Sequence, residues 1–310
     1  MRDWERCAVA PSTNYKSQMD PQLLNELQPE ENLRKLLAVS GRRKDGRALA
    51  EGRRLVISRN PYTPAPSSAS NASGDVVTIG SSLVHLGETK IACGVTLQVG
   101  MPTTLHPHLG AIEFDVSLGT LCSLRYDQRG KPDDAYEIES LLTAVLGSDA
   151  LDLAQLCIEK ERFAYQLSVQ IVCISSAGNL QDACVLAAVA ALQASRLPAA
   201  VLQPAPGRAG TDGHTVQLSR TSSAPLRLRS VPVPVTMAVF DGALLLDPSD
   251  DELLVAHGVV RSVVLTDGSL GYFSHVDSRG TGMSAQDLLG AAAAAQVAAV
   301  GVRQRIAEQD

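Results

Sequence analysis

The stretch FAYQLSVQIVCISSAGNLQDACVLAAVAALQAS, residues 163–195, decides the fold class because it joins an apolar strand to an alanine-rich helix through one tight turn. Residues 163–175 have the length and apolar density of a central β-strand. Gly178-Asn179 marks a turn, and an amphipathic helix is expected from Asp182. A strand followed by a turn and a helix indicates a sheet with helices packed on it.

The same order of elements recurs on both sides of this stretch. Upstream, a hairpin turns at Gly87-Glu88, a further strand is expected over residues 111–117, and a helix follows. Downstream, hairpins turn at Asp241-Gly242 and Asp267-Gly268. A final helix opens with Ser284 and Asp287 spaced as a capping box. The pattern predicts an α/β fold, an α+β sandwich built from a duplicated β-hairpin and helix unit.

Four segments follow from this pattern. Residues 1–40 form an N-terminal extension with a helix that opens at Pro29, and residues 41–198 form the first half of the core. Residues 199–229, which include QPAPGRAGTDG, are expected to be a loop-rich insertion, and residues 230–310 form the second half with the final helix. A shorter stretch rich in Pro, Ser and Asn, residues 60–74, predicts a flexible insertion.

Composition limits the classes of function. The chain has 310 residues, 45% of them apolar, and a net charge of -6 from 27 basic and 33 acidic side chains. Charge alone therefore predicts no general attraction to nucleic acid or to a membrane, and any RNA contact must be local. The absence of a signal-like stretch and of a long apolar run predicts an intracellular protein with no membrane association.

The cysteines and the polar motifs favour neither a metal nor a cofactor. No C-x-x-C pair is present, which predicts buried, reduced thiols. The HPH sequence at 106–108 has no third ligand nearby. The acidic group at 247–252 is typical of a solvated turn, and the glycine-rich residues 277–287 do not have the spacing of a phosphate-binding loop. We expect no bound metal and no cofactor.

Four motifs together resemble the RNase PH family, and their order and spacing fit over about residues 41–290. They are KDGR at 44–47, GSSLVHLGETKIACGV at 80–95, GNLQDACVLAAVAAL at 178–192 and VPVTMAVFDGALLLDPSDDE at 233–252. Within the family, the chain is most similar to the non-catalytic ring subunits of the eukaryotic RNA exosome.

The resemblance implies a set of partners. Paralogous RNase PH-like subunits would form a hetero-hexameric ring, with S1/KH-type cap subunits, a catalytic nuclease subunit and single-stranded RNA. It also implies the nucleus and nucleolus, and the cytoplasm, as locations.

The stretch SLRYDQRGKPDDAYEIESLL, residues 123–142, bears on catalysis. Active members of the family hold phosphate with an arginine pair at a helix N-terminus, just before a Glu-Ile dipeptide. Here that dipeptide is Glu137-Ile138, and the arginine positions hold Asp133 and Asp134. Each unit-charge pair at ~4 Å is worth about 1 kcal/mol in water and about 4 at an effective dielectric of 20. Replacing two positive charges by two negative ones therefore opposes phosphate binding. One of the two aspartates is expected to be the helix N-cap instead.

Two further positions imply the same loss. The family's aspartate before a Gly-Gly turn corresponds to Ala177, and a second carboxylate corresponds to a position at or near His257. Phosphorolysis needs a bound phosphate, a polarised phosphodiester and a proton donor together. The expectation is a chain without catalytic residues. An active phosphorolytic 3'-to-5' exoribonuclease remains the alternative.

Three cations precede the acidic pair: Arg125, Arg129 and Lys131. In similar ring members, the corresponding loop lies near the central pore, where spaced cations can hold an RNA backbone without reading its sequence. The resemblance thus implies an RNA-binding role for these residues. A role as surface charges that keep the protein soluble is the competing interpretation.

Overall fold

The computed structural model describes residues 27–62, 76–126, 130–204, 214–278 and 283–309. The chain divides into two units, residues 1–49 and residues 50–310, so the larger unit begins nine residues after the predicted boundary at residue 41. In the smaller unit, helix α2 (Pro29–Ser40) starts at the predicted proline and ends at Gly41, whose φ of 62° is left-handed. Most of the predicted insertion at residues 60–74 lies outside the described residues.

The larger unit contains a six-stranded sheet in the order β1-β2-β3-β6-β4, with β5 paired to β6. All pairs are antiparallel except β4 with β6. The β2–β3 turn falls at Gly87, as the sequence predicts, with φ 59°. The strands are β1 (Leu55–Arg59), β2 (Val77–Leu86), β3 (Thr89–Gly100), β4 (Ala111–Ser117), β5 (Cys157–Glu159) and β6 (Phe163–Ser175).

A second, four-stranded sheet has the order β10-β9-β11-β12 and is antiparallel throughout. Its strands are β9 (Val233–Phe240), β10 (Ala243–Leu246), β11 (Gly258–Val264) and β12 (Leu270–Asp277). The turn between β9 and β10 has positive φ at both Asp241 and Gly242. Two positive φ angles are what a tight two-residue hairpin turn requires, so this predicted hairpin is confirmed.

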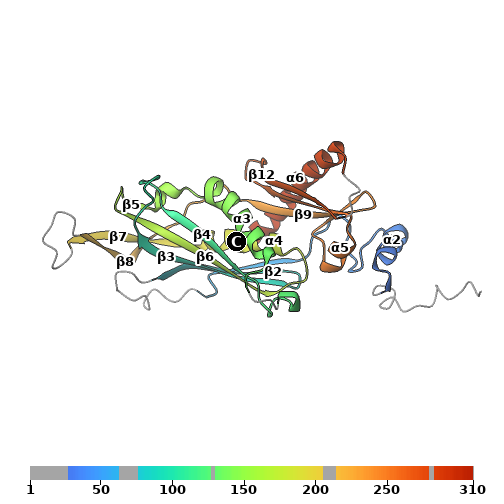
Figure 1. Cartoon of the computed structure of the whole chain (residues 1–310), viewed down its shortest axis with the longest axis horizontal. Helices are drawn as coiled ribbons and strands as arrows, with labels where there is room; N and C mark the ends of the chain where they lie inside the picture. Colours follow the sequence, from blue (N-terminus) through green and yellow to red (C-terminus); the bar gives the residue numbers. More distant parts are fainter. Residues whose placement is uncertain (1–26, 63–75, 127–129, 205–213, 279–282, 310) are drawn as a thin grey trace, which may run out of the picture. The chain divides into compact units, whose positions relative to one another are not determined.

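Helix α4 (Leu180–Ala194) packs on β2 and β3 of the first sheet and on β9 of the second (Figure 1). Twelve of its fifteen residues are buried, so the predicted amphipathic helix is wrong: a helix covered on both sides is apolar all round. Close packing is required at Gly80 of β2, where a Cβ atom would lie 2.2 Å from the Ser195 hydroxyl and 2.8 Å from the Ala191 carbonyl oxygen.

The remaining helices cover the sheets. Helix α3 (Asp133–Val145) packs on β4 and β12, and the short α5 (Asp250–Val255) lies against β9. Helix α6 (Ala285–Ala307) starts with the predicted Ser284 capping box and packs on β9 and β11. Each sheet therefore has its own following helix, as the duplicated α/β sandwich predicts. Short irregular turns of helix occupy Leu124–Tyr126, Leu146–Ala150 and Leu153–Leu156.

Helix α6 is long and apolar enough to cross a membrane by length and composition, and it is the one described helix that passes this test. Helices that cover a sheet can have the same length and composition. Its buried side is a line of small residues, Ala291, Ala295 and Ala299, which pack into the core beside Val235 and Val260. The absence of membrane association stays a prediction.

The segment at residues 199–229 corrects the sequence prediction of a loop-rich insertion. Strands β7 (Arg196–Pro204) and β8 (His214–Pro225) pair antiparallel and extend as a hairpin at the left of Figure 1. Among the hairpin side chains that the structure describes, Leu197 is the one that is buried, Ala200 and Leu218 pack partly against the core, and Val201 and Leu202 are exposed. With so little burial, the alternation of apolar and polar residues that predicts a strand is confined to a short run such as Val216–Ser219.

Candidate functional site

The amino end of α3 carries the acidic pair at its first turn. The N-cap is Pro132, and no side chain caps the helix, so the expectation that Asp133 or Asp134 is the N-cap is wrong. Asp133 is exposed, whereas Asp134 turns toward the preceding loop. The side chains of Arg125 and Tyr126 compete with the N–H groups of the first helical turn for the Asp134 carboxylate. Asp134 accepts hydrogen bonds from these two side chains rather than from the helix backbone.

Arg125 is neutralised by this aspartate. Its guanidinium lies 2.7 Å from the Asp134 carboxylate, and the Tyr126 hydroxyl donates to the same oxygen, also at 2.7 Å. Arg125 also lies over the Tyr126 ring, 4.7 Å from its centroid. Burial and the bond to Asp134 raise the pKa of the Tyr126 phenol above its ordinary value. The three side chains form one connected group, in which Tyr126 is buried and Arg125 is exposed.

Lys131 is tied to two other carboxylates. Its ammonium group lies 2.8 Å from Asp115 on β4 and also bonds Glu139 on α3. Glu139 accepts a further bond from the Val116 backbone N–H at 2.7 Å. Arg129, the third predicted RNA contact, lies outside the described residues. Around α3, the described acidic groups therefore outnumber Arg125 and Lys131.

Ala177 lies in a turn that other parts of the chain hold firmly. Its N–H donates to the Thr89 hydroxyl at 3.1 Å, and its carbonyl accepts from Arg53 at 2.9 Å. The next residue, Gly178, has φ 95°, and a Cβ atom there would lie 2.6 Å from the Asp250 nitrogen. No space is therefore left for a side chain at Gly178.

The loop that contains Arg125 meets the same turn. The Cys122 carbonyl accepts from the Ser176 N–H at 3.2 Å, so the structure brings the Ala177 turn and the Arg125 loop together.

His257 lies in a different setting. Its ring nitrogen is 3.8 Å from Asp241, and its ring centroid is 5.3 Å from that of Phe240. Its backbone N–H donates to the Val239 carbonyl at 2.8 Å. These contacts hold His257 against the β9–β10 hairpin, where it packs as a half-buried residue.

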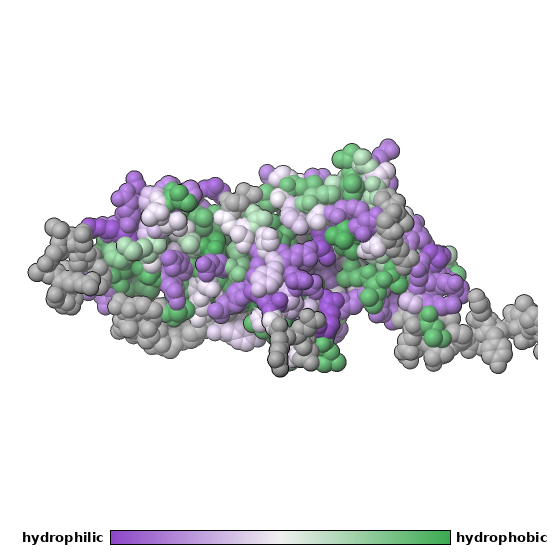
Figure 2. Space-filling view, viewed as in Figure 1, coloured by the Kyte–Doolittle hydropathy of each residue, from purple (hydrophilic) through white to green (hydrophobic). Residues whose placement is uncertain are grey.

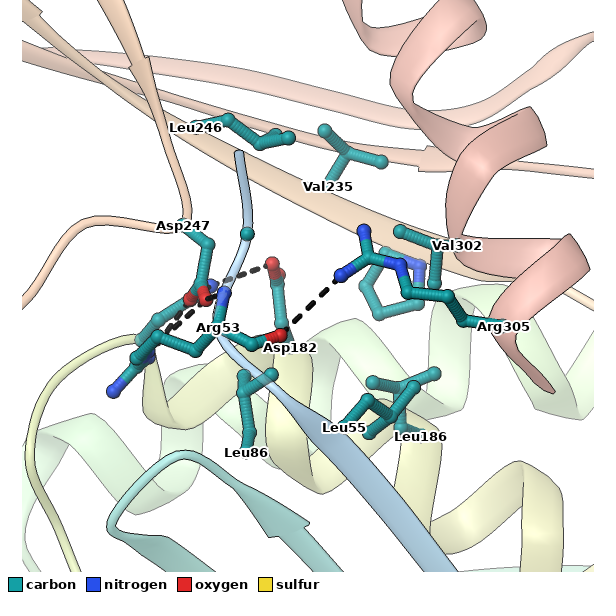
Figure 3. A pocket seen from close by; sticks show the side chains of 13 residues that line it. Arg53, Leu55, Leu86, Asp182, Leu186, Val235, Leu246, Asp247, Val302 and Arg305 are labelled. Atoms are coloured by element: carbon teal, nitrogen blue, oxygen red, sulfur yellow. Dashed lines mark hydrogen bonds and ion pairs between the residues drawn. The ribbon is translucent and has the colours of Figure 1, made fainter. Parts of the chain in front are cut away.

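A buried polar cluster, which the sequence analysis missed, joins the two halves of the larger unit (Figure 3). Arg53 binds Asp247 with two parallel bonds, Nη2 to Oδ1 at 2.8 Å and Nε to Oδ2 at 3.0 Å. Its remaining donors reach the carbonyls of Ala177 and Gly178 and the Thr89 hydroxyl. The guanidinium therefore has no donor left for a ligand.

Asp182 is the second carboxylate of the cluster. It accepts from the Thr236 N–H and hydroxyl, at 3.0 and 2.7 Å, and from the Asn179 amide at 2.8 Å. Burial raises the pKa of Asp182 to about 6, although these bonds favour the charged form. Burial would also raise the pKa of Asp247, but the bonds and charge of Arg53 outweigh it and hold that pKa below its usual value.

A small cavity of about 30 Å³ lies beside the cluster. Arg305 of α6 reaches across it to the Arg53 carbonyl at 3.3 Å (Figure 3). The Asn179 Oδ1 atom is buried without a hydrogen-bond partner. Asp247, expected in a solvated turn, is 6% exposed and has φ 51°, so that expectation is wrong. Its position directly after the apolar run Ala243–Leu246 was the available signal for burial.

The described residues contain no group of three or more His, Cys, Asp or Glu side chains placed to hold a metal ion. The five cysteines in the described ranges are free, and all are buried except Cys157, which is half-buried. The arrangement as a whole offers ion pairs that hold segments together, and it places acidic groups at the helix start where the family resemblance implies an anion site.

Comparisons with known proteins agree with this architecture. Residues 51–198 match the model of the 3' exoribonuclease family, domain 1, and residues 230–298 match domain 2 of that family. The exosome complex component rrp43 of Schizosaccharomyces pombe is 29% identical over 234 residues, 75% of this chain and 78% of the relative. The exosome complex component Rrp42 of Thermococcus onnurineus is 30% identical over 275 residues, 88% of this chain and 92% of the relative.

A solved structure has the same fold. It is that of an Archaeoglobus fulgidus exosome with RNA bound to the active site, with a TM-score of 0.72 at 24% identity over 89% of this chain and 97% of the matched chain. The sequence motifs predict likeness to the ribosomal-RNA-processing subunits numbered forty-three and then forty-two, and both names occur among these relatives. With both domain models matched in order, the chain belongs to the 3' exoribonuclease family and has the RNase PH fold.

Proposed function

We propose that this protein is a non-catalytic, structural ring subunit of an RNA exosome, which supports 3'-to-5' RNA processing and degradation by other subunits. Relatives named as exosome components support the assembly. The observation that carries the lack of catalysis is the first turn of α3, where Asp133 and Asp134 stand and Asp134 neutralises Arg125.

The physical reason is electrostatic. A helix N-terminus attracts anions through its free N–H groups and its partial positive charge. Two carboxylates in that turn already interact favourably with the helix dipole, so a phosphate would have to approach two negative charges. The described cations nearby, Arg125 and Lys131, are held by carboxylates of the same chain.

The buried cluster does not replace the missing groups. The Arg53 guanidinium donates its hydrogen bonds to Asp247 and to the backbone carbonyls of Ala177 and Gly178. Asp182 is buried and accepts three hydrogen bonds from Thr236 and Asn179. A proton donor for phosphorolysis must reach the substrate, and this carboxyl is surrounded by its own chain.

We include RNA and protein partners in the proposal. The neighbours are paralogous RNase PH-like subunits in a hetero-hexameric ring, with S1/KH-type cap subunits and a catalytic nuclease subunit. Single-stranded RNA would pass the Arg125 loop and would have to compete with Asp134 for the guanidinium. Such a contact is weak and sensitive to salt. The proposed locations are the nucleus, the nucleolus and the cytoplasm, which a fluorescent fusion expressed at its native level would test.

The decisive experiment is a phosphorolysis assay. The purified protein, alone and with one ring neighbour, is incubated with single-stranded RNA and inorganic phosphate, and released nucleoside diphosphate is measured. We expect no release above background. Phosphate-dependent release that is lost on changing Asp133 or His257 would instead support an active exoribonuclease. A neighbour that is active by itself must be inactivated first.

Assembly gives a second test. We expect the isolated chain to be poorly soluble or self-associated, and co-expression with the correct paralogue to give a stable heterodimer. A monodisperse monomer with a cooperative thermal transition, unchanged by any paralogue, would contradict the ring.

A further inference from the structure

The outer edge of β1, at one side of the six-stranded sheet, is closed by a side chain. The Gln309 amide oxygen accepts from the Ile57 N–H at 2.7 Å, and its nitrogen donates to the Leu55 carbonyl at 2.6 Å. One glutamine thus reproduces the pair of bonds that a neighbouring strand would make. The Ile57 N–H and the Leu55 carbonyl at the centre of this edge are therefore already bonded, which opposes pairing with another strand there.

The other edge of that sheet, β4, is closed in a related way. Glu139 of α3 accepts from the Val116 N–H at 2.7 Å. The strand also carries Glu113 and Asp115, and Lys131 bridges Asp115 to Glu139. Charged side chains and a covering helix are the usual protection of an edge against pairing with another chain.

Strand β12, the edge of the four-stranded sheet, also packs against α3, but no side chain in the described ranges bonds the main chain of residues 270–276 as Gln309 bonds β1 and Glu139 bonds β4. Residues 270–276, LGYFSHV, contain no Lys, Arg, Asp, Glu or Pro. Within the described ranges, the hydrogen bonds of these residues all go to β11. An antiparallel edge strand directs alternate N–H and C=O groups outward. Phe273 and Val276 are exposed at 37% and 46%.

The apolar surface continues from β12 onto α6. Gln296 of α6 donates to the Gly268 carbonyl in the turn before β12, at 2.9 Å. Between Asp287 and Arg303, the helix has no charged residue, and Leu289, Val297 and Val300 are exposed. Figure 2 shows hydrophobic atoms over the part of the molecule where α6 lies in Figure 1. An exposed apolar surface beside an open strand edge is typical of a protein interface.

We propose that a second RNase PH-fold subunit docks on this edge by pairing its corresponding strand antiparallel with β12, which identifies one ring interface and rests on the proposed function. The chemistry of the surface favours this occupant. An unpaired main chain is satisfied best by another main chain. Residues 270–276 and the part of α6 between Asp287 and Arg303 carry no Asp, Glu, Lys or Arg, so a charged segment placed there would lose water without gaining a partner of opposite charge.

The register of β12 suits a partner with a similar strand. When two such strands pair antiparallel about Phe273, the position of Leu270 lies opposite that of Val276, and the two Phe273 positions face each other. Asp277 falls outside the paired segment, so no like charges are opposed. A subunit of the same fold presents the matching strand in the matching place.

The test compares two edge residues of equal exposure. Phe273 on the open edge and Val56 on the closed β1 edge are both 37% exposed, and each is changed to Lys in the full chain. Affinity for a co-expressed RNase PH-fold paralogue is measured, with a thermal transition to check folding. We expect Phe273→Lys to raise the Kd ~10-fold or more, and Val56→Lys to change it less than ~2-fold.

Amide hydrogen exchange on the wild-type complex gives an independent measurement if the variant is poorly folded. Residues 270–276 should become protected when the paralogue binds, whereas the Leu55–Arg59 segment should not change. The interface would be overturned if the paralogue binds but residues 270–276 gain no protection and Phe273→Lys changes the Kd no more than Val56→Lys does. The ring proposal would still stand in that case. If no RNase PH-fold paralogue binds the wild-type chain, both proposals fail.

Discussion

Arg53 and Asp247, 194 positions apart in the chain, form a buried bidentate ion pair that joins the two halves of the larger unit. Their side chains are 11% and 8% exposed. The pair also fixes the Ala177 turn, because the same guanidinium binds the carbonyls of Ala177 and Gly178. One arginine therefore connects the start of the first half, the turn before α4 and the end of β10.

We expect Arg53→Met to destabilise the protein by about 3–5 kcal/mol, because it leaves the Asp247 charge buried without its partner. Arg53→Lys should recover little of this loss, since an ammonium group cannot make two parallel bonds to one carboxylate. Urea unfolding measures the change. Arg261→Met, which removes a more exposed ion pair with Glu137, is the control and should cost less than about 1 kcal/mol. Equal losses would contradict the role of Arg53.

Asp182 should make stability depend on pH. Its pKa is raised to about 6 in the folded protein by burial, whereas the unfolded chain loses the proton near pH 4. The folded state thus binds more protons between these values, and the free energy of unfolding should fall as pH rises from about 4 to 6, by roughly 1.4 kcal/mol per pKa unit.

Asp182→Asn should remove this dependence while its amide keeps bonds to Thr236 and Asn179. Urea unfolding of both proteins from pH 4 to pH 8 provides the measurement. A wild-type curve parallel to that of the variant would show that Asp182 does not titrate in this window.

Restoring arginines at the helix start should not restore catalysis. In the variant with Asp133→Arg and Asp134→Arg, phosphate is no longer repelled, but no proton donor has been supplied. We expect phosphate-dependent RNA cleavage to stay at background in the assembled complex, whose nuclease subunit is inactivated. Phosphate binding itself should increase, which a titration with inorganic phosphate would detect. Cleavage by this variant would mean that the other catalytic groups are present.

The Arg125 loop should contribute weakly to RNA binding. Changing Arg125 and Arg129 to Ala should leave ring assembly intact and lower the salt slope of RNA binding by roughly 0.7 for each RNA phosphate that is no longer neutralised. Titrations of the complex with single-stranded RNA at several salt concentrations measure the slope. Identical slopes for wild type and variant would assign these arginines to solubility alone.

The strands and turns were predictable where local chemistry determines them. Gly87, Gly242 and Gly268 adopt positive φ at the three predicted hairpins, and Ser284 caps α6 as its spacing indicates. The β7–β8 hairpin was missed because it has little buried surface to impose a pattern. Helix α4 was predicted to have a polar face because a sequence window does not show that a second sheet covers that side.

The site was less predictable, because its contacts are non-local. The acidic start of α3 could be located from its sequence, but the choice of Asp134 to bind Arg125 rather than cap the helix depends on where the preceding loop runs. The apolar run before Asp247 could indicate its burial, but nothing local indicates that Arg53 is its partner. Arg53 lies in a basic stretch and Asp247 in an acidic turn, and both patterns are typical of solvated segments.

The burial of α4 on both sides has a consequence for the newly made chain. Residues of β2 and β3 are available to one side of the helix as soon as it leaves the ribosome, whereas β9 follows some forty residues later in the sequence. Until then, the second apolar side of α4 has nothing from its own chain to cover it. Nascent chains of this length are therefore the species in which chaperone binding and aggregation should concentrate.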